Sequence, residues 1–299
     1  MAVEYSLKGY REPAADGGKF WPACDYPGTE KSIVAAGGIN FWVETEGEGE
    51  PLILIHGGPG IDHRCFHPHL SMLAECRRLI YYDLRGHYMS SEAPDNRYGP
   101  KIDAEDVEGL RIALGLEKIA LFGYSYGSIV AHRYAEIYGE NLSHIIVSSS
   151  PIGMTGEEMD AAGSDHPLTE KIQNAKTPDE RRELFLKFYY HKPLHPQTRK
   201  YNDATYDAYP LPKNQRVLEG YEEDTDWPLD TPLGEMPHTS MPALYLYGRY
   251  DPLPLVDKLQ KKISNLKNAA CVIFQESGHD PFAEEPEKFA QVLRSFLEE

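Results

Sequence analysis

Residues 121–128 read LFGYSYGS and place one serine between two glycines. Apolar residues lead into Gly123, and a helical pattern follows Gly127. In a strand–turn–helix connection, a G-x-S-x-G sequence lets the chain turn sharply and exposes the serine side chain. A serine hydroxyl is a weak nucleophile unless a base accepts its proton and a third group orients that base. The stretch therefore predicts that Ser125 is a nucleophile with two partners elsewhere in the chain.

Strand-like and helix-like segments alternate on both sides of this stretch. Uninterrupted apolar runs at 52–55 and 119–122 are typical of strands that are buried on both faces. Residues 102–115 and 128–139 have helical spacing. Two strands within residues 32–46 should be antiparallel, because a short glycine turn joins them. This alternation predicts an α/β fold with a mostly parallel central sheet and helices on both faces.

The alternating pattern is interrupted once. Residues 151–236 are polar, punctuated by proline and rich in tyrosine, and the strand pattern resumes after them. A chain of 299 residues is long enough for one large α/β domain with an insertion. We therefore expect an N-terminal arm at 1–30, a core formed by 31–150 and 237–299, and an inserted, largely helical cap at 151–236.

The composition excludes several classes of protein. No run of eighteen apolar residues is present, and the N-terminus lacks the features of a secretory signal, so we expect no membrane segment. The net charge of −17 disfavours nucleic acid as a partner, because phosphates would be repelled. We expect a small-molecule or short-peptide substrate, and the oligomeric state stays open. The cysteines form no C-x-x-C pair and should be free thiols in a cytoplasmic protein; they are Cys24, Cys65, Cys76 and Cys271.

A serine nucleophile of this kind needs an acid and then a histidine further along the chain. Of the seven histidines after Ser125, only His279 follows a late strand and precedes the last helix. That loop should lie at the carboxyl edge of the sheet, as Ser125 does. Asp251 directly follows the preceding apolar run, whereas Asp257 falls in the next helix and Asp280 is too close to His279 to orient it. We therefore predict that Ser125, Asp251 and His279 form a catalytic triad.

The sequence HGGPG at residues 56–60 follows the third predicted strand. A tetrahedral oxyanion needs two or more fixed backbone N–H donors, and glycine permits the close approach that they require. We expect the N–H of Gly57 or Gly58, together with that of Tyr126, to form an oxyanion hole.

Several potential metal ligands follow this loop, in the stretch DHRCFHPHL. The spacing of His63, Cys65, His67 and His69 matches no familiar zinc signature, and serine chemistry needs no metal. The pattern G-x-G-x-x-G, which binds nucleotides, is not present either. The sequence therefore predicts neither a metal site nor a cofactor.

Taken together, these residues resemble the α/β-hydrolase superfamily, and more narrowly the prolyl iminopeptidase-like serine hydrolases. The motifs HGGPG, DLRGHYMSS, GYSYGS, GRYDP and SGHDPF each match a family position. The resemblance implies the α/β-hydrolase fold and an acyl-enzyme reaction on small substrates that carry an N-terminal amine. Cap carboxylates hold that amine in the iminopeptidases, which makes Glu219, Glu222 and Glu223 candidate substrate ligands here.

One position departs from the family pattern D-x-R-G-x-G-x-S, because Tyr88 replaces the second glycine. A tyrosine adopts a glycine-only conformation at a cost, so we expect this loop to be reshaped. Three other functions stay open. They are a carboxylesterase or lactonase for a small cyclic or aromatic ester, a carbon–carbon hydrolase or lyase with the same triad, and a non-catalytic ligand receptor.

Overall fold

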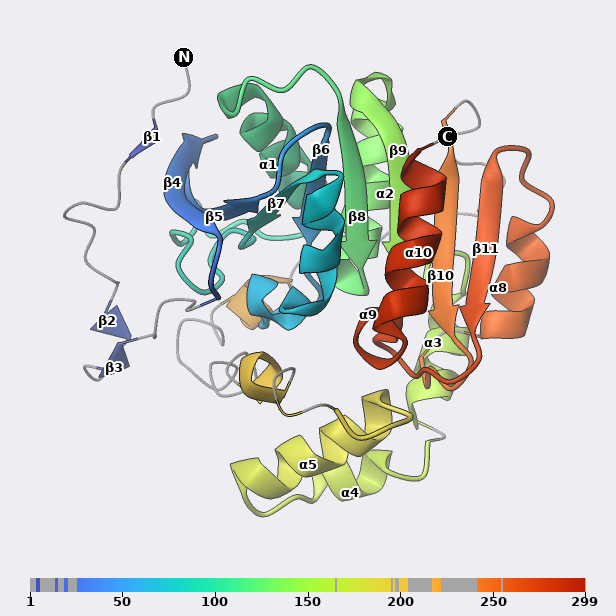
Figure 1. Ribbon diagram of the computed structural model, residues 1–299. Helices are drawn as coiled ribbons and strands as arrows, with labels where there is room; N and C mark the ends of the chain where they lie inside the picture. Colours follow the sequence, from blue (N-terminus) through green and yellow to red (C-terminus); the bar gives the residue numbers. More distant parts are fainter. Residues whose placement is uncertain are drawn as a thin grey trace.

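A nine-stranded sheet lies at the centre of the computed structural model, in the order β1-β4-β5-β7-β6-β8-β9-β10-β11 (Figure 1). The structure describes residues 26–164, 166–194, 196, 199–203, 217–221, 241–253 and 255–298. Before them it describes three two-residue strands, β1 (Glu4–Tyr5), β2 (Ala14–Ala15) and β3 (Lys19–Phe20).

Six of the strands, from β6 to β11, run parallel to one another. Strand β5 pairs with β7 in the antiparallel sense, and β4 and β1 follow it in the same way. The prediction of a mostly parallel sheet with an antiparallel pair at its start is therefore confirmed. The strands are β4 (Glu30–Ala36), β5 (Ile39–Glu46), β6 (Pro51–Ile55), β7 (Arg78–Tyr82), β8 (Ile119–Tyr124), β9 (Leu142–Ser148), β10 (Ala243–Gly248) and β11 (Ala269–Phe274).

Helices cover both faces of the sheet because the strand residues alternate between two apolar layers. On β6, Ile53 and Ile55 enter the layer under α1, α2 and α8, whereas Leu52 and Leu54 enter the layer under η2, α9 and α10. Each such side chain contributes about 1.5–3 kcal/mol by leaving water. The helices are η1 (His63–Phe66), η2 (His69–Glu75), α1 (Pro100–Ala113), α2 (Tyr126–Tyr138), η3 (Gly139–Asn141), α8 (Val256–Ile263), α9 (Pro281–Glu284) and α10 (Pro286–Leu297).

Much of the described part of the segment between β9 and β10 is helical. It contains α3 (Gly156–Ser164), α4 (Thr169–Gln173) and α5 (Pro178–Tyr189). Helix α5 begins at Pro178 because the hydroxyl of Thr177 accepts a hydrogen bond from the backbone N–H of Glu180, 3.1 Å away. In Figure 1, α4 and α5 lie beyond the carboxyl ends of the parallel strands, which places them beside the site described below.

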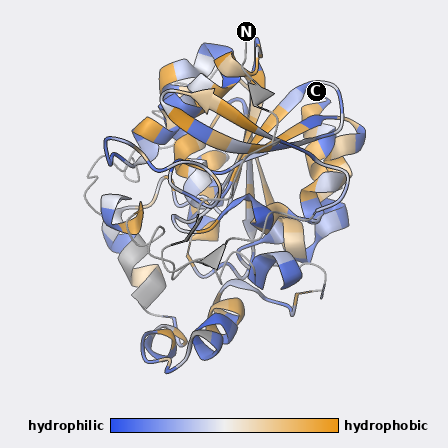
Figure 2. Cartoon of the chain, turned by 90° about the vertical axis from the view of Figure 1, so that its left-hand side faces the viewer, coloured by the Kyte–Doolittle hydropathy of each residue, from blue (hydrophilic) through white to orange (hydrophobic). Residues whose placement is uncertain are grey.

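The apolar residues gather along the sheet and on the helix faces that cover it, while α4 and α5 are largely hydrophilic (Figure 2). In the described part of the chain, no helix combines the length and the apolar character needed to cross a bilayer. Cys65, Cys76 and Cys271 are free thiols, as predicted, and Cys24 lies outside the described residues.

Candidate active site

Ser125 stands at a sharp turn between β8 and α2. Its backbone has φ 51° and ψ −115°, a combination that L-residues rarely adopt. The glycines on either side make this turn possible. A Cβ on Gly123 would lie 2.3 Å from the carbonyl oxygen of Gly127, and a Cβ on Gly127 would lie 2.2 Å from that of Ile55. Only glycine fits at either position, so the serine is presented at the end of the strand as the sequence predicts.

His279 and Asp251 form a buried pair on the same edge of the sheet. Asp251 follows β10, and His279 lies in the loop between β11 and α9. The Nδ1 atom of His279 lies 2.9 Å from each carboxylate oxygen of Asp251. Burial by itself lowers the pKa of His279, but the Asp251 carboxylate, together with Asp280 and Glu284, outweighs burial and raises that pKa above its usual value. An Nδ1–H that donates to Asp251 leaves Nε2 for proton transfer.

Ser125 and His279 line one cavity of about 270 Å³. The core contributes Gly58 and Ile61 to its wall, and the segment between β9 and β10 contributes Phe185 on α5. Tyr189 and Tyr190, from the same tyrosine-rich segment, also line it. Ser125 and His279 thus line one cavity from two separate loops, and His279 is paired with Asp251 from a third loop. Residues of the segment between β9 and β10 form part of the cavity wall.

The HGGPG loop lies against the serine. A Cβ on Gly57 would lie 3.2 Å from the Cβ of Ser125 and 2.9 Å from the ring of Tyr124, so this position must stay a glycine. Gly58 has φ 112°, which only glycine adopts without strain, and it lines the cavity. Tyr126 is the first residue of α2. Its N–H belongs to the first turn, where backbone donors point out of the helix.

Two buried histidines connect this loop to the loop after β7. The backbone N–H of Gly60 donates to Nε2 of His87, 3.0 Å away. The backbone N–H of Leu84 donates to Nε2 of His56, 3.1 Å away. Burial lowers the pKa of His56, which favours the neutral ring that can accept this hydrogen bond. These two bonds fix the backbone of the glycine loop relative to the sheet.

Tyr88 occupies the position where the family pattern has glycine, and its φ is 37°. Its side chain is buried, and the guanidinium carbon of Arg64 lies 4.2 Å from the centre of its ring. The ring also meets Trp42 edge-on, with centroids 6.3 Å apart. This packing and the cation–π contact offset the cost of a left-handed backbone at a bulky residue.

Asp280 is a site residue that the sequence reasoning set aside. It lines the cavity, and it accepts hydrogen bonds from the hydroxyls of Tyr124 and Tyr190. The amide of Asn202 in turn donates to the hydroxyl of Tyr190, at 2.8 Å. Burial raises the pKa of Asp280, although His279 and the two tyrosines oppose that change. Because Asp280 directly follows His279 in the sequence, it was not expected to orient that histidine. This adjacency does not prevent Asp280 from contacting a substrate.

The candidate carboxylates of the cap are placed differently. Glu219 is exposed to solvent, while its neighbour Leu218 lines the cavity. Glu222 and Glu223 lie outside the described residues. Their role in binding a substrate therefore stays a prediction.

A family model described as alpha/beta hydrolase fold matches residues 50–286. The chain belongs to this family. A proline iminopeptidase from Saccharolobus solfataricus is 26% identical over 283 residues, which cover 88% of this chain and 90% of that protein. A pimeloyl-[acyl-carrier protein] methyl ester esterase from Aliivibrio fischeri is 27% identical over 263 residues, which cover 86% of this chain and 96% of that protein.

Among solved structures, an esterase from Exiguobacterium antarcticum superimposes on this hydrolase with a TM-score of 0.69. The identity is 23%, and the match covers 89% of this chain and 99% of that one. This similarity shows the fold alone. The predicted membership of the α/β-hydrolase superfamily is therefore confirmed, and it makes the protein a hydrolase of that family.

Proposed function

We propose that this protein is a serine hydrolase that works through an acyl-enzyme intermediate. One observation carries the proposal: a serine on a strained turn lines the same small cavity as a buried histidine that is paired with an aspartate. Ser125 attacks an acyl carbonyl while His279 accepts its proton and passes it to the leaving group. Asp251 holds the imidazole in the required tautomer. Water, activated by the same histidine, then releases the acyl group.

The HGGPG loop and the start of α2 supply the oxyanion hole in this scheme. Gly57 lies against Ser125 and Gly58 lines the cavity, which supports one donor from this loop. Tyr126 supplies the second backbone N–H from the first turn of α2. Loss of a single donor of this kind costs about 10²–10³-fold in kcat.

We infer that the substrate is a small acyl compound with a free amine, as in a proline iminopeptidase. A cavity of about 270 Å³ suits an acyl group the size of one residue. The carboxyl group of Asp280 lines that cavity and can pair with an ammonium group, which would otherwise be costly to bury. The similarity to an iminopeptidase over most of both chains supports the same reading.

An esterase is the second candidate. Ile61, Phe185 and Leu218 give the cavity apolar surfaces that accept an uncharged acyl chain, and a methyl ester esterase is about equally similar in sequence. Two p-nitrophenyl esters separate the two functions, because prolyl and cyclopentanecarbonyl groups have nearly the same shape and differ in charge. A higher kcat/KM for the prolyl ester, with turnover of proline arylamides, supports the iminopeptidase reading.

The serine mechanism itself is tested with a fluorophosphonate probe and the substitution Ser125→Ala. We expect stoichiometric labelling of the wild-type protein at Ser125, and loss of both labelling and ester turnover in the variant. Ser71→Ala is the matched control, since Ser71 lies on η2 and bonds to Glu46, outside the cavity. Undiminished turnover by a folded Ser125→Ala protein would reject the mechanism.

A further inference from the structure

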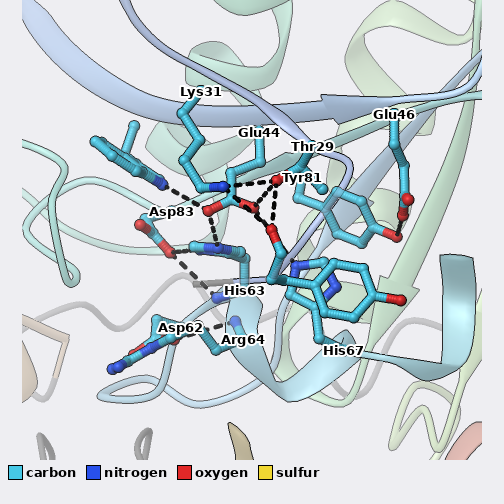
Figure 3. Close-up of polar contacts among 12 residues, drawn as sticks. Thr29, Lys31, Glu44, Glu46, Asp62, His63, Arg64, His67, Tyr81 and Asp83 are labelled. Atoms are coloured by element: carbon cyan, nitrogen blue, oxygen red, sulfur yellow. Dashed lines mark hydrogen bonds and ion pairs between the residues drawn. The ribbon is translucent and has the colours of Figure 1, made fainter. Parts of the chain in front are cut away.

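A second group of chemically active side chains lies outside the residues that line the cavity, and two of its members shortly follow the HGGPG loop in the sequence. Glu44 on β5 meets His63 and His67, which belong to η1 and the residue that follows it (Figure 3). All three side chains are fully buried. One oxygen of Glu44 lies 3.2 Å from Nε2 of His63, and the other lies 3.6 Å from Nε2 of His67.

These separations match the spacing of ligand atoms around a tetrahedral metal ion. Bonds of about 2.0–2.1 Å from zinc to nitrogen or oxygen place two ligand atoms about 3.3 Å apart. The three ligand atoms of Glu44, His63 and His67 all lie within 4.8 Å of one another. We propose that these three residues bind one divalent transition-metal ion such as zinc.

The residues around the trio orient it as the outer shell of a metal site does. Nδ1 of His63 lies 2.7 Å from the carboxylate of Asp83, which also accepts the backbone N–H of His63. A metal-bound histidine commonly donates its second ring N–H to a carboxylate in this way, which directs Nε2 at the ion. Glu44 is oriented in turn by the hydroxyl of Thr29, at 3.0 Å, and by the indole N–H of Trp42, at 3.3 Å.

Aromatic residues pack against the ring of His67. It stacks on Tyr26 with centroids 4.1 Å apart and an angle of 12° between the planes. The ring of Tyr81 also contacts the His67 ring, with centroids 4.7 Å apart. A ring fixed in this way loses little conformational entropy when it binds an ion.

The balance of charge also favours a cation. Glu44 and Asp83 are fully buried, and a buried carboxylate needs a compensating charge. Lys31, at the edge of the group, donates to two neutral acceptors, the hydroxyl of Thr29 and the backbone carbonyl of Tyr26. A divalent ion balances both carboxylates with both imidazoles neutral. Two nitrogen ligands and one oxygen ligand suit zinc and its neighbours, whereas calcium and magnesium prefer oxygen alone.

Such an ion would have a structural role that the serine chemistry does not require. It would tie β5 to η1, which follows directly on the HGGPG loop at residues 56–60. Because the trio is fully buried, binding would be linked to folding, and removal of the ion would lower the melting temperature. The spacing of His63 and His67 could not reveal this site, because the third ligand comes from a strand before the loop.

The test is the metal content of the untagged wild-type protein, measured by plasma mass spectrometry. We expect about one zinc ion per chain, and visible d–d absorption typical of tetrahedral coordination after replacement by cobalt. A chelator should lower the melting temperature, and zinc should restore it. Ser125→Ala should bind the ion as the wild type does, so this result is independent of the proposed hydrolase activity.

Substitutions of the proposed ligands test whether the ion is bound at this position. His67→Gln and Glu44→Gln should lose metal and the cobalt spectrum, whereas the matched control His69→Gln should keep both, because His69 is buried but lies outside the trio. If the variants do not fold, the wild-type content and the cobalt spectrum still decide. A folded wild-type protein that contains no metal, takes up no cobalt and does not change in stability with zinc overturns the proposal. In that case a protonated His63 bridges the two carboxylates.

Discussion

At the scale of single residues, the reactivity of Ser125 depends on the protonation of His279. Only the neutral imidazole can accept the serine proton. Burial lowers the pKa of His279, but Asp251, together with Asp280 and Glu284, outweighs it and raises that pKa above its usual value of 6.5. The value of kcat/KM should therefore rise with pH through a midpoint above 6.5 and level off at higher pH.

The substitution Asp251→Asn tests this dependence. Without the carboxylate, burial lowers the pKa of His279 against only the charges of Asp280 and Glu284, so the midpoint of the pH profile should move to lower pH. The rate on the plateau should fall by about 10⁴-fold, because the imidazole loses its fixed tautomer. Asp257→Asn is the control, since Asp257 pairs with Arg249 at the surface. An unchanged midpoint in a folded Asp251→Asn protein would show that Asp251 does not act on His279.

Some residues of the candidate site could be predicted from the sequence, and some of their contacts could not. Ser125, Asp251 and His279 could be found because each follows an apolar run, and the order of the three along the chain is characteristic of the fold. The contact between Asp280 and Tyr190 could not be found, because it joins two residues that lie 90 positions apart in the sequence. No local pattern encodes that distance.

At the scale of elements, the loop that carries His279 is held between the core and the end of α5. The backbone N–H of His279 donates to the carbonyl of Tyr189, at 2.7 Å. On α9, the carboxylate of Glu284 accepts the N–H of Gly278 at 2.6 Å and that of Lys192 at 2.8 Å. Burial raises the pKa of Glu284 from 4.5 to about 7 despite these hydrogen bonds.

The raised pKa of Glu284 predicts a trend of stability with pH. Folding favours the protonated carboxyl, so this contribution to stability is complete below pH 4.5 and is lost as pH rises through about 7. Glu284→Gln removes the titration. The melting temperature of the variant, relative to wild type, should therefore increase between about pH 5 and about pH 8.

Glu285→Gln is the matched control for this trend. Burial by itself raises the pKa of the Glu285 carboxylate. Hydrogen bonds from the Ser277 hydroxyl and the backbone N–H of Glu276 outweigh burial and lower that pKa below its usual value. The Glu285 carboxylate is ionised in both the folded and unfolded states over the same pH range. The difference in melting temperature between Glu285→Gln and wild type should therefore not change with pH. A Glu284→Gln difference that is equally constant would contradict the assigned pKa.

The elements themselves were predictable to different degrees. Apolar runs predicted β6 and β8, because a strand buried on both faces has no room for polar side chains. The place of β7 between β5 and β6 was not predictable, because it depends on pairing across segments distant in the chain. The 3₁₀ geometry of η2 at His69–Glu75 was not predictable either, because no local pattern marks its tighter turn.

At the scale of the whole molecule, the net charge of −17 acts on every substrate that approaches the cavity. A negative field raises the local concentration of cations and lowers that of anions. Salt screens this field over about 10 Å at 0.1 M, so the effect on association depends on ionic strength. Whether kcat/KM falls or rises with ionic strength therefore indicates whether the substrate is a cation or an anion.

Three esters with the same leaving group make this measurable. As ionic strength rises, kcat/KM should fall by up to about tenfold for a prolyl ester, rise for a succinyl ester, and stay constant for an acetyl ester, which is the control. The effect should lie in kcat/KM and leave kcat unchanged, because the distant charges act on the encounter and not on the acyl transfer. Equal responses from the three esters would show that the overall charge does not reach the cavity, and that Asp280 alone must distinguish an amine from a neutral acyl group.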